Sequence, residues 1–413
     1  MRVLLSTIGS RGDVQPMVAL ALKLREMGQE ARICAPPDFR EWIGELGISF
    51  VPVGPAVRQT AAPQPSVAPP ATPQTPPTPE QFQKLMEDTV AGQFEAIAPA
   101  ARDCDVLVAG MSLQFALHSI AEQMGVPYVY TAWCPVTLPS PHHAPPPLPA
   151  RVQPAAGTAD NPTLWAQEAK RWNDYWAAAI NSHRAAAGLA PIPDVRNHIM
   201  TDRPWLAADA TLAPWAETTG LEIFQTGAWL PLDERPLSAE LEAFLDAGEP
   251  PVYFGFGSMR APRDVSQAIV GAAREVGRRA IISGGWGGVT VPDEGGCLCI
   301  GEANLQSLFR RVAAVVHHGG AGTTTVAALA GAPQVVVPQI YDQHYWAGRV
   351  RQLGIGRAHA PGAPTAESLT EALQRTLQPG VAVRAREVGA LVRTDGAEMA
   401  ARRLIEIAGA GRS

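Results

Sequence analysis

The sequence predicts an α/β protein with two domains, each built on a parallel, doubly wound β-sheet. Its 413 residues suit two domains of roughly 200 residues each. The N-terminal part places a helical pattern, Val14–Met27, between two apolar strand-like runs, Arg2–Ile8 and Glu30–Cys34. A second series of strands begins at Pro251–Phe256. In such sheets, ligands bind in the crevice outside the carboxyl ends of the strands.

Further elements follow the same pattern, and their order sets the predicted domain boundaries. We expect a first domain over residues 1–214, a linker over 215–237 and a second domain over 238–395. The last segment, 396–413, is predicted to form a helix that crosses back to the first domain. The individual elements expected are strands Asp105–Gly110 and Val126–Thr131, helix Val265–Val276, strands Ala280–Ser283 and Cys297–Ile300, short helix Leu305–Phe309, a strand ending at His317, and helix Gly396–Ile407.

Composition and charge exclude several classes of protein. The formal net charge of -6 and the pI near 5.9 argue against nucleic-acid binding, which requires a basic surface. No apolar run approaches the roughly 20 residues that a membrane helix needs, and the N-terminus lacks a signal-peptide pattern. We therefore expect a soluble, cytoplasmic protein that is a monomer and has no stable membrane insertion. Five cysteines in such a chain favour reduced thiols, and Cys297 and Cys299 are expected to be buried rather than metal-binding.

The segment from Val315 to Gln343 carries the strongest functional signal. An apolar run ends in two histidines, and a glycine turn then opens a helix rich in Thr and Ala. The bare N–H groups at such a turn and the helix dipole favour a bound anion. The pair Asp342 and Gln343, one strand later, supplies an acceptor and an amide suited to sugar hydroxyls. Together these features indicate a nucleotide-sugar.

This segment resembles the donor-binding signature of UDP-type glycosyltransferases, which have two facing Rossmann-like domains and a deep cleft between them, the GT-B fold. Nearly the whole chain is similar to the glycosyltransferases of glycopeptide antibiotics of the vancomycin and teicoplanin type. The other blocks in matching order are LLSTIGSRGDVQPMVALALKLREMGQEARICAPPDF, TDRPWLAADATLAPW, FQTGAWLPLDERPLSAELEAFL and PVYFGFGS.

The resemblance implies an inverting, metal-independent transfer of a hexose, favouring glucose, from a UDP- or TDP-sugar to a phenolic hydroxyl of a heptapeptide aglycone. The donor is a substrate, and no cofactor is expected. A macrolide, sterol or glycolipid acceptor stays open, as does a UDP-sugar 2-epimerase, and a catalytically silent binding partner is disfavoured. The proline-rich segments Pro52–Pro79 and Pro135–Pro149 are expected to be mobile loops that shape an acceptor pocket, the alternative being loops without function.

The matching motif SRGD makes Asp13 the expected base that deprotonates the acceptor. The structural alternative is that Asp13 is the N-cap of a helix whose first turn is Val14 to Pro16. Arg11 is expected either to steady the diphosphate or to be a surface charge. The donor-binding residues that the resemblance implies are Ser10, Arg11, Gly12, Gly257, Ser258, Trp286, Ala303, Gln306, His318, Gly319, Gly320, Ala321, Gly322, Thr323, Asp342 and Gln343.

Within this set the resemblance gives each group a partner on the donor. The glycine turn, His318 and Ser258 would stabilise the charge that builds on the leaving diphosphate. Ala303 would bind the uracil or thymine, with Trp286 as a wall. Gly284 stands where close relatives tend to carry Arg, so the choice between UDP and TDP stays open. The D-x-D sequence at Asp103 is interpreted as an ordinary turn and not as a metal site.

Overall fold

The computed structural model describes most of the chain, and the statements below concern that part. The described residues are 1–58, 78–111, 113–146, 159–218, 220–258, 265–286, 288–289, 291 and 296–410. Most of the first proline-rich segment (59–77) and the end of the second (147–149), which were predicted to be loops that shape an acceptor pocket, lie outside them. No described helix combines the length and the apolar character needed to cross a bilayer.

The N-terminal sheet has seven parallel strands among the described residues, in the order β3-β2-β1-β4-β5-β6-β7. Its central strands are short apolar runs that are buried on both faces, as parallel strands covered by helices must be. The strands are β1 (Arg2–Thr7), β2 (Glu30–Ala35), β3 (Ser49–Pro52), β4 (Val106–Gly110), β5 (Tyr128–Ala132), β6 (Trp205–Leu206) and β7 (Phe224–Gln225).

Helices cover both faces of this sheet and bury two apolar clusters against it. The two long helices among them, α4 and α6, pack against one another. The helices are α1 (Arg11–Glu26), α2 (Arg40–Glu45), α4 (Pro79–Ala101), α5 (Leu117–Met124), α6 (Asn161–Ala186) and α7 (Val195–Met200), with 3₁₀ turns η1 (Pro37–Phe39) and η2 (Pro135–Thr137).

The C-terminal sheet has six parallel strands among the described residues, in the order β10-β9-β8-β11-β12-β13. The strands are β8 (Val252–Gly255), β9 (Ala280–Ser283), β10 (Cys297–Ile300), β11 (Ala314–His317), β12 (Gln334–Val336) and β13 (Gly356–Ala358). The helices are α8 (Ala239–Asp246), α9 (Val265–Glu275), α10 (Leu305–Leu308), α11 (Ala321–Leu329), α12 (Gln343–Gln352), α13 (Ala366–Thr376) and α14 (Pro379–Gly389), with the 3₁₀ turn η3 (Phe309–Arg311).

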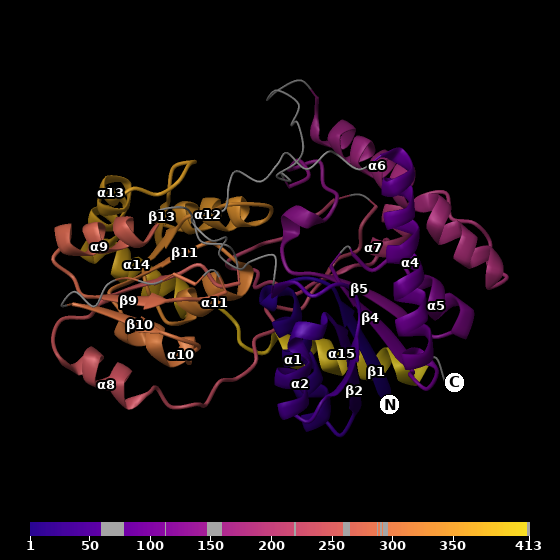
Figure 1. The fold of residues 1–413 in the computed structure, drawn as a ribbon, viewed down its shortest axis with the longest axis horizontal. Coiled ribbons are helices and arrows are strands. Elements are labelled where there is room, and N and C mark those ends of the chain that lie inside the picture. Colours follow the sequence, from indigo (N-terminus) through magenta and orange to yellow (C-terminus); the bar gives the residue numbers. More distant parts are fainter. Residues whose placement is uncertain are drawn as a thin grey trace.

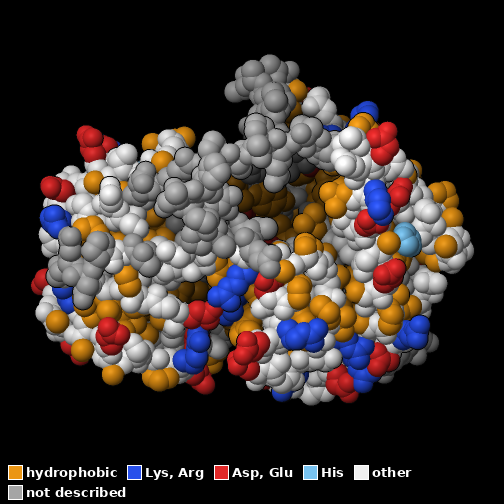
Figure 2. All heavy atoms as spheres, in the orientation of Figure 1, with side chains coloured by type: hydrophobic (Ala, Val, Ile, Leu, Met, Phe, Trp, Pro, Cys, Tyr) orange, Lys and Arg blue, Asp and Glu red, His pale blue; other side chains and the backbone are white. Residues whose placement is uncertain are grey.

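The two domains lie side by side, and the last helix returns to the first domain (Figure 1). This helix, α15 (Gly396–Ala410), packs against α1 and buries Ala400 and Leu404 in an N-terminal core cluster. A hollow separates the two halves on the face shown in Figure 2, and hydrophobic side chains line its visible wall. The prediction of two parallel, doubly wound sheets that face one another is confirmed.

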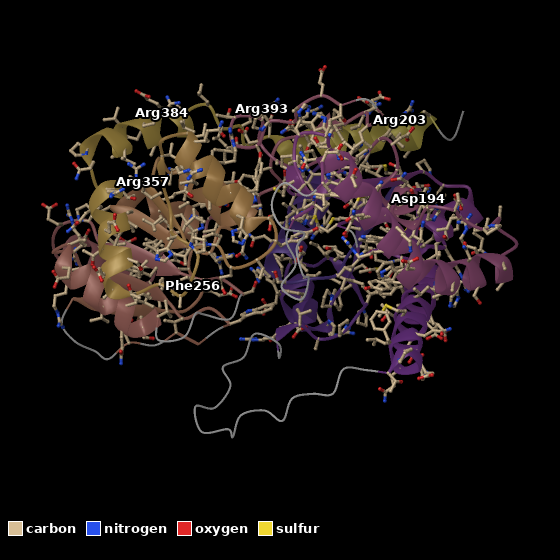
Figure 3. The ribbon with its side chains drawn as sticks, turned by 90° about the horizontal axis from the view of Figure 1, so that it is seen from above. Asp194, Arg203, Phe256, Arg357, Arg384 and Arg393 are labelled. Atoms are coloured by element: carbon tan, nitrogen blue, oxygen red, sulfur yellow. The ribbon has the colours of Figure 1, made fainter. Side chains whose placement is uncertain are left out.

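The chain crosses between the domains twice, and the two crossings touch. A Cβ atom on Gly396 would lie 2.5 Å from the carbonyl oxygen of Gly227, so this approach requires glycine. Nearby, the backbone N–H of Arg393 donates to Asp209 Oδ2 at 2.9 Å, and Arg393 lies at the junction of the domains in Figure 3. Arg349 Nε donates to the carbonyl oxygen of Leu212 at 2.7 Å. These bonds and the close approach of the two crossings hold the two domains together at this junction.

One sequence expectation about the cysteines is wrong. Cys297 and Cys299 lie on β10 as predicted, but Cys299 is exposed and Cys297 is only partly buried. The reason is that β10 lies at the edge of its sheet, so one of its faces is not fully covered. Cys34, Cys104 and Cys134 are buried free thiols in the first domain.

Candidate active site

Asp13 lies at the carboxyl end of β1, in the first turn of α1. The helix begins at Arg11, three residues earlier than predicted, with Ser10 as its N-cap. The N–H of Ser10 donates to Asp13 Oδ2 at 2.7 Å. Asp13 is therefore the third residue of the helix, where an acidic side chain reaches back to the cap residue. The alternative that Asp13 itself is the N-cap is wrong.

Gly9 leaves the space that the Asp13 carboxylate occupies. A Cβ atom at Gly9 would lie 2.2 Å from Asp13 Oδ2, well inside van der Waals contact. The carboxylate thus rests directly on the backbone that follows β1, and the residue keeps a partly exposed position. Sequence analysis did not select Gly9, although the spacing Gly-Ser-x-x-Asp contains the signal.

Asp342, which belongs to the other domain, carries a second carboxyl group whose pKa depends on the charge of Asp13. Burial raises the pKa of Asp13 to about 6, although hydrogen bonds from Ser10 oppose the shift. Burial also raises the pKa of Asp342 to about 7, and the negative charge of Asp13 adds to that increase. The effect of the Asp13 charge on Asp342 indicates that the two carboxyl groups lie in the same region of the molecule, although they come from different domains.

The raised pKa values predict how stability depends on pH. Both folded-state values lie above the ordinary value of 3.8, so the folded protein favours the protonated carboxyls. The stability they contribute is present below about pH 4 and is lost as pH rises through about 6 and 7. We expect the double variant Asp13→Asn/Asp342→Asn to gain Tm relative to the unmodified protein between about pH 4 and 8. Thermal unfolding across this range measures the difference, and a constant difference would contradict the assignment.

The glycine turn follows β11 and carries two histidines with different surroundings. His317 is fully buried and bonds to Gln334 Oε1 through Nε2 at 2.9 Å. Its Nδ1 accepts the N–H of Gly319 at 3.1 Å. The N–H of Gly319 is thus already paired, which narrows the expected anion site to the N–H groups of Gly320 and the first turn of α11. Those first-turn groups have no acceptor within a helix.

His318 is held between two glycines at this turn. A Cβ atom on Gly257 would lie 2.8 Å from His318 Cε1, and one on Gly320 would lie 2.6 Å from His318 Nε2. Burial lowers the pKa of His318 to about 4, so the imidazole is neutral near pH 7. A neutral imidazole still offers one N–H to a phosphate oxygen. The structure therefore brings His318, Gly320 and Gly257 together.

The other predicted donor-binding residues of this region lie next to His318 in the sequence or follow Gly257. Ala321, Gly322 and Thr323 form the first turn of α11, with Gly320 at the N-cap. The hydroxyl of Thr324 bonds back to the carbonyl of Gly320 at 2.9 Å, whereas that of Thr323 has no partner among the described residues. Ser258 follows Gly257 after β8 and is partly exposed.

Asp342 and Gln343 begin α12, and part of their bonding capacity is already used. Asp342 occupies the N-cap position, yet its Oδ2 accepts the indole N–H of Trp346 at 3.1 Å and makes no capping bond. Gln343 Oε1 accepts the N–H groups of Gln339 at 2.8 Å and Ile340 at 3.2 Å. Among the described residues, the amide group Nε2 of Gln343 and the second oxygen of Asp342 stay available for a sugar.

The segment expected to bind the nucleotide base borders a pocket of about 440 Å³. Ala303 and Glu302 lie on its wall together with Arg235. Gln306, in contrast, donates its side-chain N–H to the carbonyl of Pro231 at 2.7 Å, so that group ties the segment to the linker.

Arg11 and Trp286 make contacts between the domains. The guanidinium of Arg11 lies 3.4 Å from the ring centre of Trp42, and its Nη1 is 3.9 Å from Glu302 Oε1 of the second domain. Trp286 of the second domain packs against Phe39 of the first, with ring centroids 5.8 Å apart. Both side chains thus contact the other domain. The backbone N–H of Trp286 also donates to the carbonyl oxygen of Gly257 at 3.1 Å, and Gly257 lies against His318.

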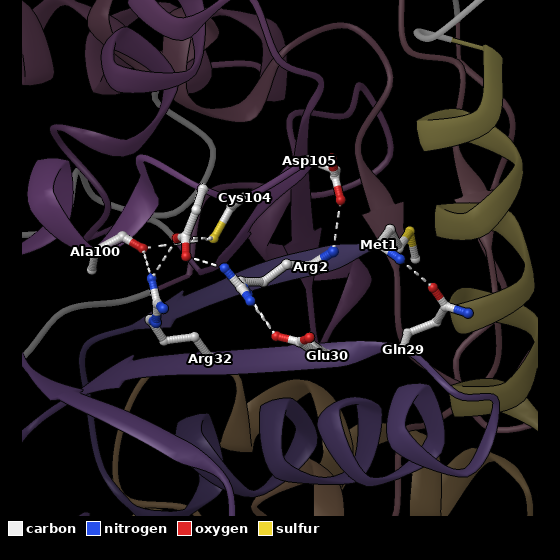
Figure 4. A network of polar contacts seen from close by, with 9 residues as sticks. Met1, Arg2, Gln29, Glu30, Arg32, Ala100, Cys104 and Asp105 are labelled. Atoms are coloured by element: carbon white, nitrogen blue, oxygen red, sulfur yellow. Dashed lines mark hydrogen bonds and ion pairs between the residues drawn. The ribbon is translucent and has the colours of Figure 1, made fainter.

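The D-x-D sequence belongs to a network of polar contacts with arginines of β1 and β2 (Figure 4). The carboxylate of Asp103 bonds to Arg2 and to Arg32, and Asp105 Oδ2 accepts the N–H of Arg2 at 2.7 Å. These residues precede β4, whereas Asp13 follows the other end of the neighbouring β1. The carboxylates of this turn are therefore paired with two arginine side chains and a backbone N–H of β1.

Among the described residues, one cluster has the composition of a metal site. It consists of His118, Glu122 and His198, whose candidate ligand atoms lie within 4.8 Å of one another. Glu122 is already bonded to the buried guanidinium of Arg184. A cation there would be repelled by Arg184, and the cluster lies on α5 and α7, away from Asp13.

Comparisons with known proteins agree with this geometry. The family model "Glycosyltransferase family 28 N-terminal domain" matches residues 3–140, and "Erythromycin biosynthesis protein CIII-like, C-terminal domain" matches residues 291–403. Glycosyltransferase GtfE of Amycolatopsis orientalis is 50% identical over 97% of this chain and 96% of its own length. The vancomycin aglycone glucosyltransferase of the same organism is 47% identical over 98% and 97%.

The chain belongs to the vancomycin-type glycosyltransferases. A further relative of this glycosyltransferase, the dTDP-epi-vancosaminyltransferase of Amycolatopsis orientalis, is 43% identical over 94% of this chain and 93% of the relative. Among solved structures, glycosyltransferase VinC in complex with DTDP superposes with a TM-score of 0.66 at 20% identity, covering 99% and 100% of the two chains. This likeness shows the shared fold, and the GT-B expectation is confirmed.

Proposed function

We propose that this glycosyltransferase moves a hexose, with glucose favoured, from a UDP- or TDP-sugar to a phenolic hydroxyl of a heptapeptide aglycone, with inversion. The observation that carries the proposal is the glycine turn after β11, which holds His318 between Gly257 and Gly320 and lies against the backbone of Gln343 at Gly319. The relative named as a vancomycin aglycone glucosyltransferase supports the acceptor class and the glucose donor.

In the proposed reaction, Asp13 accepts the phenol proton while the phenol oxygen forms a bond to C1 of the sugar. The bond from C1 to the β-phosphate oxygen breaks on the opposite face, and the nucleoside diphosphate leaves with the bonding electron pair. The first turn of α11 and the His318 N–H stabilise that charge without a metal ion. Asp342 and Gln343 hold sugar hydroxyls, which favours glucose over a donor lacking them.

The proposal extends to the setting in which the enzyme works. We place the reaction in the cytoplasm, on a monomer that binds donor and aglycone and neither nucleic acid nor a membrane. Light scattering at working concentration measures the mass in solution. The mass of a dimer would show that the enzyme is not a monomer, and it would not change the proposed reaction.

The reaction is tested by incubating the protein with a vancomycin-type aglycone and, in turn, UDP-glucose, TDP-glucose and a TDP-deoxyaminosugar. The expected product has the mass of the aglycone plus one hexose, and it forms fastest with a glucose donor. Transfer only from the deoxyaminosugar would overturn the donor assignment. A second arm omits the aglycone, and conversion of the UDP-sugar there would favour a 2-epimerase.

A further inference from the structure

A shallow groove of about 590 Å³ runs along the surface of α12. The helix begins directly after Asp342, and at a rise of ~1.5 Å per residue the groove extends from roughly 3 to 15 Å beyond that residue. The residues that line it are His344, Tyr345, Gly348, Arg349, Arg351 and Gln352.

The groove borders the first domain as well as the sugar site. Tyr345 packs against the apolar cluster that contains Cys134, which follows β5 at the carboxyl edge of the N-terminal sheet. Arg349 bonds to the carbonyl oxygens of Leu212 at 2.7 Å and Thr211 at 3.1 Å. In Figure 1, α12 extends toward the N-terminal domain. A large acceptor whose hydroxyl points at Asp13 can therefore reach this groove.

Gly348 gives the groove a bare floor that the helix itself does not require. Glycine within a helix costs about 0.5–1 kcal/mol relative to alanine. Gly348 lies in the interior of α12 without a positive φ, and a Cβ atom there would meet nothing within 4 Å. No turn or close packing explains the glycine, whereas a flat ring laid on the helix backbone would explain it.

Arg351 supplies a free positive charge at the far end of the groove. Its side chain is exposed and makes no ion pair or hydrogen bond with any described residue. Arg349, by contrast, is held by Leu212, Thr211 and Gln352. An unpaired guanidinium three residues beyond a bare stretch of helix backbone, on the same face of the helix, suits a flat group that carries a carboxylate.

We propose that this groove is an acceptor subsite that binds the carboxylate end of the peptide aglycone. Arg351 pairs with the carboxylate, and an aromatic ring of the acceptor lies on Gly348 beside Tyr345. The inference rests on the proposed function, because it takes the acceptor to be a peptide. It goes beyond the proposed function by stating which part of the acceptor the second domain binds.

The test compares Arg351→Gln and Gly348→Leu with the unmodified enzyme, using aglycone as the free acid and as its carboxamide. Arg351→Gln should raise the aglycone KM about tenfold for the free acid, the worth of one exposed charge-assisted pair, and leave the carboxamide unchanged. Gly348→Leu should raise KM for both acceptors without lowering Tm, since leucine is the better helix former. The donor KM should not move in either variant.

The matched controls are Arg310→Gln, an exposed arginine outside the groove, and Gly92→Leu in α4, where a Cβ atom also meets nothing within 4 Å. Equal loss for acid and carboxamide in Arg351→Gln, or an unchanged KM in both groove variants, would overturn the subsite. Equilibrium binding of the aglycone without donor separates this from the proposed function. Arg351-dependent binding in a protein that transfers no sugar would refute the reaction and keep the subsite, and absence of binding would refute the subsite.

Discussion

Replacing Asp13 by Asn is expected to lower kcat for glycosyl transfer by about 10²- to 10⁴-fold, the range found for loss of a general base. Asparagine is nearly isosteric and keeps an oxygen for the N–H of Ser10, which Asp13 now accepts at 2.7 Å. The helix start and the fold should therefore persist. What the variant loses is the ability to take the proton of the acceptor hydroxyl. Steady-state kinetics with the aglycone, together with calorimetric binding of UDP and TDP, measure the two effects separately.

Asp103→Asn is the control. This carboxylate precedes β4, at the amino ends of the strands of the same sheet, and it bonds to Arg2 and Arg32. It should leave kcat unchanged and at most lower Tm. Nucleotide affinity should be equal in the enzyme and in Asp13→Asn. Full turnover by Asp13→Asn would show that another group takes the proton, and loss of nucleotide binding would show that Asp13 belongs to the donor site.

Gly320→Ala is expected to lower kcat/KM for the donor by about 10- to 150-fold, the value of one hydrogen bond to a charged group. The new Cβ atom would lie 2.6 Å from His318 Nε2, so the imidazole must move away from the turn. The backbone of Gly320 has φ of -64°, which alanine adopts without strain. The loss should therefore appear in donor binding and catalysis, with little change in stability. Donor kinetics and thermal unfolding of the same samples test both parts.

Gly44→Ala provides the comparison for this variant, because it lies in α2 and its Cβ position is open. It should keep full activity. His318→Ala should reproduce the loss seen in Gly320→Ala. Combining the two substitutions should add little, because each of them removes the imidazole N–H of His318 from the donor site. Additive losses would mean that alanine at position 320 acts through the anion-binding backbone instead.

The sequence predicted the strands well wherever burial on both faces demands a continuous apolar run. Cys297–Ile300 and Ala280–Ser283 were predicted with the bounds that the structure has. The start of α1 was missed by three residues, because Ser10 and Asp13 cap one another reciprocally and the apolar pattern begins only at Val14. Helix α4 was not predicted, although Thr78 and Gln81 form a capping box at its start, because the preceding prolines masked the signal.

The sequence predicted which types of residue lie at the site, but it did not predict the hydrogen-bond partners of those residues. Residue types placed a carboxylate after β1 and a glycine turn after β11, since both follow apolar strands. Tertiary contacts then decided which groups stay free. His317 takes the N–H of Gly319, the turn before α12 takes the oxygen of Gln343, and Phe39 receives Trp286. Phe39 is remote in sequence from Trp286. The other partners lie within the Val315–Gln343 segment, whose residue pattern does not show which of its groups pair with one another.

Helix α15 belongs by sequence to the end of the chain and by packing to the beginning. Residues such as Leu404 complete the core around α1. Hybrid enzymes made by exchanging halves of two relatives at a single breakpoint would therefore join a foreign tail to the acceptor half. An exchange with two breakpoints, which returns residues 396–410 with their own first half, should give the better folded hybrid.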